Sequence, residues 1–253
     1  MIEIRDLEVR LGGRAVLRAV GARAMPGDAI ALIGRNAAGK TTLVRAMAGL
    51  VAPSGGSVAL DGRDVRTFTP RERARRIAFV AQRPVVSAAF TVRETVALGR
   101  FALPSDPTRI DRALSDLGLA DLADRPYHAL SVGQQQRAAL ARALAQAEPT
   151  SVLLLDEPFA ALDLAEVGRS LHLVRRHAEA GGIVVAVLHD LAVAAALAKR
   201  VWILDEGTLA DDARVEVALD PGRLEARYGI AFEQTASGLP CPLWTRPASG
   251  RDG

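Results

Sequence analysis

The sequence predicts an α/β fold: a mixed, mainly parallel sheet with covering helices, an N-terminal antiparallel β subdomain and an inserted helical subdomain. Short apolar segments alternate with segments of helical spacing, and this alternation is typical of parallel strands joined by right-handed crossovers. The first part of the chain instead shows short alternating segments and tight turns. From residue 84 to residue 147 the β pattern disappears. We therefore expect a core of residues 1–83 and 148–220, a helical subdomain at 84–147 and a C-terminal appendage at 221–253.

The first strand is expected to end at the Gly12-Gly13 turn, because apolar and polar residues roughly alternate before it. The run 29–33 is apolar on both faces, as a central strand of a covered sheet is, and a helix is expected at 41–50 after it. Further core elements are expected as strands at 58–60, 77–80, 152–155, 183–188 and 201–204 and as helices at 70–76, 164–180 and 191–198.

The insertion is expected to contain helices at 91–101, 108–117 and 133–147. Thr108 and Asp111 have the spacing of a capping box at the start of the second of these helices. The segment after Asp220 is weakly patterned. We expect it to form a small appendage whose last ten residues fray.

Composition places the chain among ordinary soluble proteins, with 49% hydrophobic and 24% charged residues in a length of 253. No apolar run reaches the roughly 18 residues that cross a bilayer, and no secretory signal opens the sequence. We therefore expect a cytoplasmic protein, or one docked on the cytoplasmic side of a membrane. Cys241 is the single cysteine, which excludes an internal disulfide and a multi-cysteine metal site.

Arginine carries nearly all of the positive charge, since Lys40 and Lys199 are the only lysines and the net charge is +3. One cluster of arginines suits contact with nucleic acid or acidic lipid, but a solvated helix face is the favoured interpretation. Its members are Arg71, Arg73, Arg75 and Arg76.

A phosphate-binding loop follows the strand at 29–33 and matches the pattern G-x-x-x-x-G-K-[ST]. In this pattern backbone N–H groups and the N-terminus of the next helix face phosphate oxygens. Lys40 is expected to reach the β- and γ-phosphates of ATP, and the Thr41 hydroxyl to bind Mg²⁺. The sequence therefore predicts a P-loop NTPase core. The nucleotide-binding residues predicted here are Gly34, Arg35, Asn36, Ala37, Ala38, Gly39, Lys40, Thr41 and Thr42.

Two carboxylates, Asp156 and Glu157, end the apolar strand at 152–155. Ligands of open α/β sheets bind beyond the carboxyl ends of the strands, so both acids are expected beside the phosphate loop. Asp156 is predicted to hold Mg²⁺. Glu157 is predicted to polarise the water that attacks the γ-phosphate.

With these motifs the sequence resembles the ATP-binding-cassette (ABC) transporter ATPases. The most specific element is the string 130–137, Leu-Ser-Val-Gly-Gln-Gln-Gln-Arg, which is similar to that family's signature motif. Physically, Ser131 is a good N-cap and Gly133 permits close backbone approach, so this is a second helix N-terminus suited to phosphate. The resemblance implies that Ser131, Gly133 and Gln134 contact nucleotide.

Three further positions follow in the family's order, within a resemblance that runs from about residue 2 to residue 215. Gln82 matches the Q-loop glutamine, which senses the γ-phosphate and Mg²⁺. Asp163 closes the D-loop string 160–163. His189 matches the switch histidine, which contacts the γ-phosphate. Taken alone, such a glutamine would be polar surface and such a histidine a structural residue; their order in the set favours the functional interpretation.

The resemblance also implies partners. Two copies of the chain would pair head to tail, with each ATP between one phosphate loop and the partner's signature motif. Separate transmembrane permease subunits and a periplasmic or extracellular solute-binding protein complete such a system, with no nucleic acid. The chain would be a peripheral subunit on the cytoplasmic face of the inner (plasma) membrane.

Several strings resemble ATPases that import iron–siderophore complexes, haem or cobalamin; they lie at 71–79, 91–100, 184–191 and 237–240. Importers of zinc, manganese or other small solutes remain the near alternatives. A soluble ABC ATPase that acts on the ribosome or DNA is a further one, although no second cassette or long coiled coil is present. A nucleotide-gated module that does not hydrolyse ATP is opposed by Glu157.

Four positions depart from the family pattern. Ala37 replaces a glycine of the phosphate loop, and a positive φ there would strain it by about 1 kcal/mol. Val132 replaces the first glycine of the signature, and Leu11 stands where an aromatic residue usually stacks on adenine. Phe159 replaces a small hydroxyl residue, with a mild effect expected. We hypothesise that these changes lower nucleotide affinity but leave hydrolysis intact.

Overall fold

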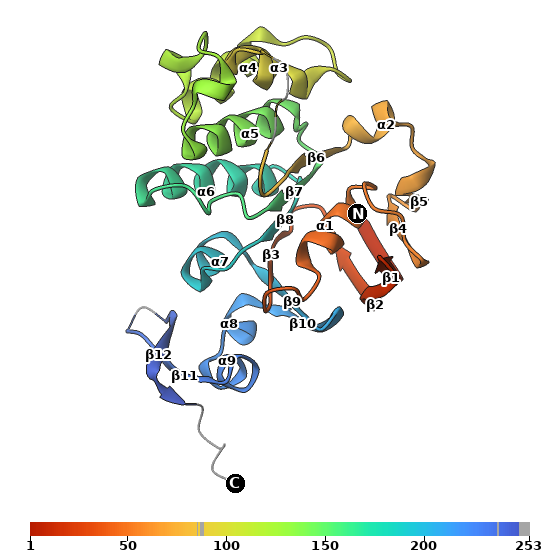
Figure 1. The fold of residues 1–253 in the computed structure, drawn as a ribbon, viewed down its shortest axis with the longest axis vertical. Coiled ribbons are helices and arrows are strands. Elements are labelled where there is room, and N and C mark those ends of the chain that lie inside the picture. Colours follow the sequence, from red (N-terminus) through yellow and green to blue (C-terminus); the bar gives the residue numbers. More distant parts are fainter. Residues whose placement is uncertain (85, 87–88, 237, 248–253) are drawn as a thin grey trace.

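The computed structural model describes residues 1–84, 86, 89–236 and 238–247, and its central feature is a sheet of the order β10-β9-β3-β8-β7-β6 (Figure 1). Neighbouring strands from β9 to β6 are parallel, and β10 is antiparallel to β9. The chain therefore returns across the sheet through helices between strands, as the alternating pattern predicts. The strands are β3 (Ala29–Ile33), β6 (Ile77–Val80), β7 (Val152–Asp156), β8 (Ile183–Val187), β9 (Arg200–Asp205) and β10 (Thr208–Arg214).

The N-terminal part forms a second, antiparallel sheet of the order β2-β1-β4-β5. Its apolar side chains, among them Ile2, Leu7 and Val9, are buried and face helix α1 and one side of the central sheet in a shared hydrophobic core. The antiparallel N-terminal sheet is thus confirmed. Its strands are β1 (Ile2–Leu11), β2 (Arg14–Ala24), β4 (Gly55–Leu60) and β5 (Arg63–Asp64).

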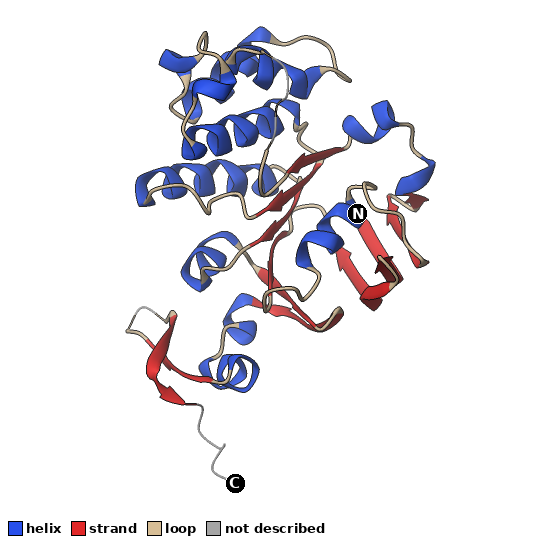
Figure 2. Cartoon of the chain, in the orientation of Figure 1, coloured by secondary structure: helices blue, strands red, loops and turns tan. Residues whose placement is uncertain are grey.

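Helices cover both faces of the central sheet (Figure 2). Helix α1 packs between the two sheets, and the other face carries a second hydrophobic core that is rich in alanine. This second core extends from the strands through α5 into the helical subdomain, so one apolar interior connects them. The helices of these two layers are α1 (Lys40–Met47), α5 (Val132–Gln146), α6 (Leu164–Glu179) and α7 (Leu191–Leu197).

The helical subdomain differs from the prediction at two helix boundaries. The helix expected at 91–101 is α3 (Val92–Ala97) followed by the 3-10 turn η2 (Leu98–Arg100). Helix α4 (Pro107–Asp116) is capped by Asp106, whose side chain accepts from the Arg109 N–H, so the predicted Thr108 and Asp111 capping box is wrong. A proline at the first helical position fixes the helix start one residue before Thr108.

The turn η1 (Val65–Thr67) precedes α2 (Pro70–Ala74), and the turns η3 (Ala120–Leu122) and η4 (Tyr127–Ala129) connect α4 to α5. Gln146 at the end of α5 donates hydrogen bonds to the carbonyls of Ala74 and Ile77, which ties the helical subdomain to the core. The subdomain boundaries at 84 and 147 stay a prediction.

The C-terminal appendage is more regular than its weak pattern suggests. After α8 (Val215–Ala218) comes α9 (Pro221–Tyr228), followed by a hairpin of β11 (Ile230–Gln234) and β12 (Pro240–Pro247). Leu224 is fully buried and joins the core, which anchors α9 to the domain. The fraying expected for the last ten residues does not apply up to Pro247, and 248–253 lie outside the described residues.

Candidate nucleotide-binding site

The phosphate loop connects the end of β3 to the start of α1. Gly34 has φ 146°, and a Cβ atom there would lie 2.0 Å from the Leu204 carbonyl oxygen of neighbouring β9. Gly39 has φ 105°, and its Cβ would lie 2.8 Å from Leu17 Cδ2. Both positions therefore require glycine, because a side chain would push the loop off the strand and sheet that support it. The loop is a tightly seated backbone cradle.

The tip of this loop carries the first departure from the family pattern. Ala37 has φ 63°, in the left-handed region that costs a non-glycine residue about 1 kcal/mol. The positive φ expected to strain Ala37 is therefore present. Arg35, Asn36 and Ala37 are exposed, whereas Ala38 is buried and its carbonyl accepts from the Gly207 N–H at 3.1 Å.

Lys40 is the first residue of α1 and turns its ammonium group back over the loop. Its Nζ donates to the carbonyl oxygens of Gly34 at 2.8 Å and Arg35 at 2.9 Å. Burial lowers the pKa of Lys40, and the negative charges of Glu157 and Asp156 oppose that shift. The charged amine therefore lies inside the cradle, beside the two acids. Thr42, the third residue of α1, is half-buried.

Asp156 is fully buried at the end of β7, and its Oδ1 accepts a hydrogen bond from Thr41 Oγ1 at 3.1 Å. Its Oδ2 is buried and has no partner among the described residues. Burial raises the pKa of Asp156, while the Thr41 bond lowers it. An unpaired buried carboxylate oxygen beside a hydroxyl is a costly arrangement that a hard cation would relieve, and such oxygens are the ligands that Mg²⁺ prefers.

Three side chains meet where neighbouring strands end. Glu157 follows β7, Gln82 follows β6 and His189 follows β8. Gln82 Nε2 donates to Glu157 Oε2 at 2.9 Å, and His189 Nε2 lies 2.7 Å from Glu157 Oε1. Glu157 itself has φ 51°, an unfavourable backbone state that the flanking structure maintains. The tertiary structure thus joins residues that are far apart in the sequence, because the carboxyl ends of neighbouring parallel strands lie at the same edge of the sheet.

The signature residues form their own structure at the N-terminus of α5. Ser131 and Gln134 form a capping box, with the Ser131 N–H donating to Gln134 Oε1 at 2.9 Å. Gly133 lies against the loop after β7, where a Cβ atom would come 2.7 Å from the Ala161 carbonyl oxygen. Val132 at the first helical position is 71% exposed, so its side chain points away from this packing.

The structure does not bring the signature residues to the phosphate loop of the same chain. Helix α5 lies on the side of the central sheet opposite α1 (Figure 1). Among the described residues, no hydrogen bond joins the signature string to the loop. Asp163 is the N-cap of α6 and accepts from the Glu166 N–H at 2.9 Å. Within one chain, therefore, Ser131, Gln134 and Asp163 cap helix starts, and Gly133 packs against the loop after β7.

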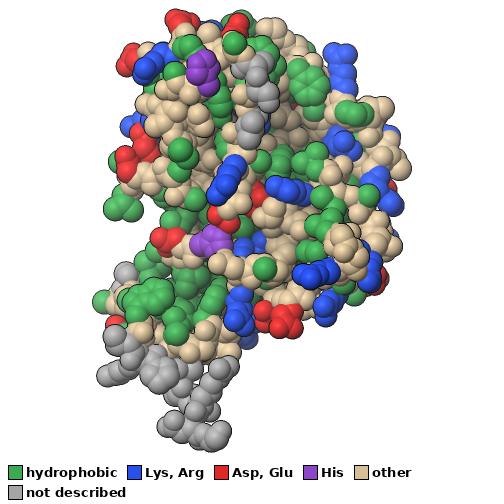
Figure 3. Space-filling view, viewed as in Figure 1, with side chains coloured by type: hydrophobic (Ala, Val, Ile, Leu, Met, Phe, Trp, Pro, Cys, Tyr) green, Lys and Arg blue, Asp and Glu red, His purple; other side chains and the backbone are tan. Residues whose placement is uncertain are grey.

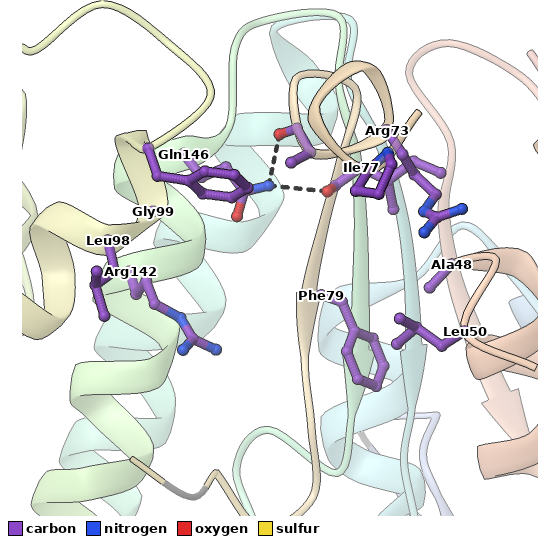
Figure 4. A pocket seen from close by; sticks show the side chains of 12 residues that line it. Ala48, Leu50, Arg73, Ile77, Phe79, Leu98, Gly99, Arg142 and Gln146 are labelled. Atoms are coloured by element: carbon purple, nitrogen blue, oxygen red, sulfur yellow. Dashed lines mark hydrogen bonds between the residues drawn. The ribbon is translucent and has the colours of Figure 1, made fainter. Parts of the chain in front are cut away.

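A separate cavity of about 410 Å³ opens between α5, the turn η2 and strand β6 (Figure 4). The large apolar side chains at its rim are exposed, with Leu50 57% and Phe101 63% accessible. Sequence reasoning missed this feature. One sequence feature pointed to the cavity, because Arg142 interrupts the mainly alanine and leucine face of α5. The wall of the cavity opposite α5 comes from segments distant in the sequence, so the pattern of α5 alone does not reveal it. The remaining lining residues are Ala48, Pro70, Arg73, Ala74, Ile77, Phe79, Leu98, Gly99 and Gln146.

Two arginines of the cluster, Arg75 and Arg76, and the nearby Arg66 have local partners. Arg75 donates to the Ala102 carbonyl, Arg76 lies 4.0 Å from Asp61, and Arg66 pairs with Asp64. On the face shown in Figure 3, basic side chains are scattered among acidic and neutral ones. This distribution favours a solvated surface for most of the cluster. Among the described residues, the longest apolar helices fall short of what a membrane crossing requires.

The loop, the buried Asp156 and the strand-end trio define a nucleotide-binding protein of the P-loop class. Comparison with known proteins gives the family. The ABC transporter family matches residues 17–160. The cobalamin import ATP-binding protein BtuD of Halobacterium salinarum is 39% identical over 234 residues, covering 90% of this chain but 58% of that protein. This chain thus spans a little over half the length of that relative.

A second relative matches along nearly its whole length. The hemin import ATP-binding protein HmuV of Pseudomonas entomophila is 38% identical over 237 residues, with 91% of this chain and 93% of the relative covered. The dimeric, post-hydrolysis structure of the ATP-binding cassette MJ0796 with ADP and Pi is 26% identical at a TM-score of 0.77, covering 85% and 99% of the two chains. The chain belongs to the ABC transporter family, and both the predicted fold class and the resemblance are confirmed.

Proposed function

We propose that this chain is the ATP-binding and hydrolysing subunit that powers an ABC importer. The observation that carries the proposal is the trio of Gln82, Glu157 and His189 at adjacent strand ends, beside the phosphate loop. A carboxylate held by two side chains at that position suits activation of water. The relatives BtuD and HmuV are named as import ATP-binding proteins, which supports the same conclusion.

In the proposed reaction, ATP and water give ADP and phosphate. The backbone of residues 34–41 binds the phosphates, and Lys40 neutralises charge on the β- and γ-phosphates. Thr42, at the start of α1, belongs to the same nucleotide-binding site. Glu157 accepts a proton from the attacking water, and His189 orients Glu157 and contacts the γ-phosphate. Positioning and charge stabilisation supply most of the barrier reduction in phosphoryl transfer.

Mg²⁺ fits the residues present. Thr41, Gln82 and Asp156 would hold it, and the unpaired Oδ2 of Asp156 is the observation that favours a cation there. Bound Mg²⁺ supplies neutralisation of charge on the β- and γ-phosphates. Among the described residues, no cluster of three or more acidic, histidine or cysteine side chains could hold a metal alone. Phosphate oxygens and water would therefore complete its shell, as is usual for Mg²⁺.

The active unit we propose is a head-to-tail dimer. Ser131, Gly133 and Gln134 of one copy would contact the ATP bound to the loop of the other, with Asp163 beside it. Two observations support this arrangement. These residues lie far from the phosphate loop of their own chain, and the first N–H groups of α5 that the capping box leaves free suit phosphate. The MJ0796 cassette is described as dimeric in its post-hydrolysis state.

Transport requires membrane partners, and we assign the apolar cavity to them. Leu50, Leu98 and Phe101 expose apolar surface there, and such a patch on a folded domain marks an interaction site. Separate permease subunits would dock on it, placing the chain at the cytoplasmic face of the membrane. A periplasmic or extracellular solute-binding protein would deliver the solute.

The solute class we propose is cobalamin or an iron complex such as haem or a siderophore. The names of the two relatives support it, because one is a cobalamin and the other a hemin import protein. Another small solute or a metal ion is the nearest alternative, and a soluble ABC ATPase is a more distant one.

The test is ATP hydrolysis by the complex of this chain with its permease in proteoliposomes. Cyanocobalamin, haemin and a ferric siderophore are compared, each presented on its binding protein. We expect one of them to stimulate hydrolysis. If none does while a zinc- or manganese-loaded binding protein does, the solute class is wrong. If no permease associates with the chain, the importer proposal fails.

A further inference from the structure

Arg142 is a largely buried cation without a counter-charge in the part of the chain that the structure describes. It lies on α5 and directs its guanidinium group into the cavity, between α5 and the wall formed by β6 (Figure 4). It makes no hydrogen bond or ion pair with any described residue. Burial lowers the pKa of Arg142, yet a guanidinium stays charged at neutral pH. The titratable group that acts on it is Tyr127, whose own pKa is raised by burial, so that phenol is neutral.

Other buried arginines of the same subdomain are fully paired. Arg100 donates to the carbonyls of Pro104 and Ala145 and pairs with Glu148 at 2.8 Å. Arg137, on α5 like Arg142, donates to the Leu117 carbonyl and pairs with Glu166 at 3.1 Å. These residues serve the stability of the chain itself. The contrast indicates that the role of Arg142 is not a contact inside the chain.

The cavity around Arg142 is apolar and cationic. A second guanidinium, that of Arg73, lines it without an ion pair, and no aspartate or glutamate is among the described lining residues. The nitrogens of Arg142 are not sealed from solvent, so water reaches them. Any segment that fills the cavity removes this water. A purely apolar segment would leave the charge buried and unpaired, which is strongly unfavourable.

We propose that the permease segment which fills this cavity carries an aspartate or glutamate whose carboxylate pairs with Arg142, flanked by apolar side chains that contact Leu98 and Phe101. This inference rests on the proposed function and adds the chemistry of the partner. An arginine–carboxylate pair is planar and can be bidentate, so it fixes orientation as well as affinity. A permease without the acid leaves Arg142 unpaired, so the pair selects which permease is accepted.

Two variants of the isolated chain separate this role from a structural one. Arg142→Met removes the charge, keeps the stem volume and leaves no buried partner behind. We expect its melting temperature to equal or exceed that of the wild type, because an unpaired charge is lost. Arg100→Met is the matched control and should lower the melting temperature, because it removes the hydrogen bonds to the Pro104 and Ala145 carbonyls and the ion pair with Glu148. A clear loss of stability in Arg142→Met would mean that the arginine has an intrachain role, and the proposal would be wrong.

The partner is identified in the assembled complex. A photo-crosslinking benzoylphenylalanine replaces Phe101, and the linked peptide is sequenced by mass spectrometry. We expect an apolar permease segment that contains Asp or Glu. Arg142→Met and neutralisation of that acid should each weaken the complex by about tenfold or more, and the double variant should be no weaker than either single one.

Each other result overturns the proposal. A linked permease segment without an acid, or effects that simply multiply, would exclude the pair while leaving the importer function intact. A crosslink between two copies of this chain would assign the cavity to self-association. Thermal stabilisation of the isolated chain by inorganic phosphate or acetate that disappears in Arg142→Met would make it a small-anion site. Failure of the wild-type chain to associate with any permease would instead remove the proposed function, and this proposal with it.

Discussion

Nε2 of His189 lies 2.7 Å from Oε1 of Glu157, while Oε2 of the same carboxylate accepts a hydrogen bond from Gln82. Both oxygens of the acid are therefore held by side chains from the two strands that flank its own. This arrangement fixes the carboxylate plane before any substrate binds. Preorganised geometry of this kind lowers the cost of reaching the transition state.

Glu157→Gln should abolish hydrolysis and leave ATP binding intact. The amide keeps the size of the side chain but is a far weaker base, and loss of a general base typically costs about 10²–10⁴-fold in rate. The ATP-bound dimer should then accumulate, which size-exclusion chromatography with nucleotide detects. Glu179→Gln on the exposed face of α6 is the control and should behave as wild type. A pure binding module would show no difference between the two variants.

Asp156→Asn should affect folding stability and Mg²⁺ binding in opposite directions. Burial raises the pKa of Asp156, so its charged form is disfavoured in the folded chain. Neutralising it should raise the melting temperature of the nucleotide-free chain and abolish the increase in ATP affinity that Mg²⁺ produces. Chelation of Mg²⁺ from the wild type should lower ATP affinity to the level of the variant. Equal Mg²⁺ dependence in both proteins would contradict the assignment of this carboxylate as a ligand.

Ala37→Gly should stabilise the phosphate loop. Relief of the left-handed strain at φ 63° is worth about 1 kcal/mol, which denaturant unfolding can resolve. ATP affinity should rise as well, because the loop would adopt its binding shape at lower cost. The neighbouring Ala38, which lacks a positive φ, provides the control: Ala38→Gly should destabilise the chain by about 0.4–1 kcal/mol. Two variants that shift stability in the same direction would refute the strain argument.

Leu11→Tyr should tighten ATP binding. Leu11 is 47% exposed at the end of β1, where the family resemblance places an aromatic residue that stacks on adenine. Stacking of a base on an aromatic ring is worth about 1–3 kcal/mol, so tenfold tighter binding is a reasonable expectation. Met25 has the same exposure at another position, and Met25→Tyr should leave affinity unchanged. Calorimetric titration with ATP checks both variants; equal affinities for Leu11→Tyr and wild type would exclude the stacking role.

His177 should make stability depend on pH. Burial lowers its pKa, while the bond from its Nε2 to the Ser151 carbonyl oxygen opposes the shift. Below the unfolded-state pKa of about 6.5 the unfolded chain binds a proton that the folded chain does not. The wild type should therefore lose more stability than His177→Gln as pH falls from 7.5 to about 5.5. Denaturant unfolding at several pH values tests this, and parallel curves would show that His177 does not contribute.

Contiguous motifs were predictable from the sequence because their geometry is local. The loop 34–41 and the acids 156–157 each follow an apolar strand directly, and the strand-end rule places them together. Helix ends were less certain, since capping depends on single residues. Helix α4 starts at the Asp106-Pro107 pair, but the sequence pattern favoured a cap at Thr108 equally well. The hairpin β11–β12 has a pattern too weak to predict.

The sequence by itself determined the fold class and the family and predicted the site residues, because strand–loop–helix motifs encode their own backbone. The tertiary structure decided which of those residues meet. It joined Glu157 to Gln82 and His189 and kept the signature residues of α5 away from the loop of their own chain. It also created the cavity around Arg142 from segments that are remote in sequence. Such contacts depend on the packing of whole elements, and no local pattern of residues carries that information.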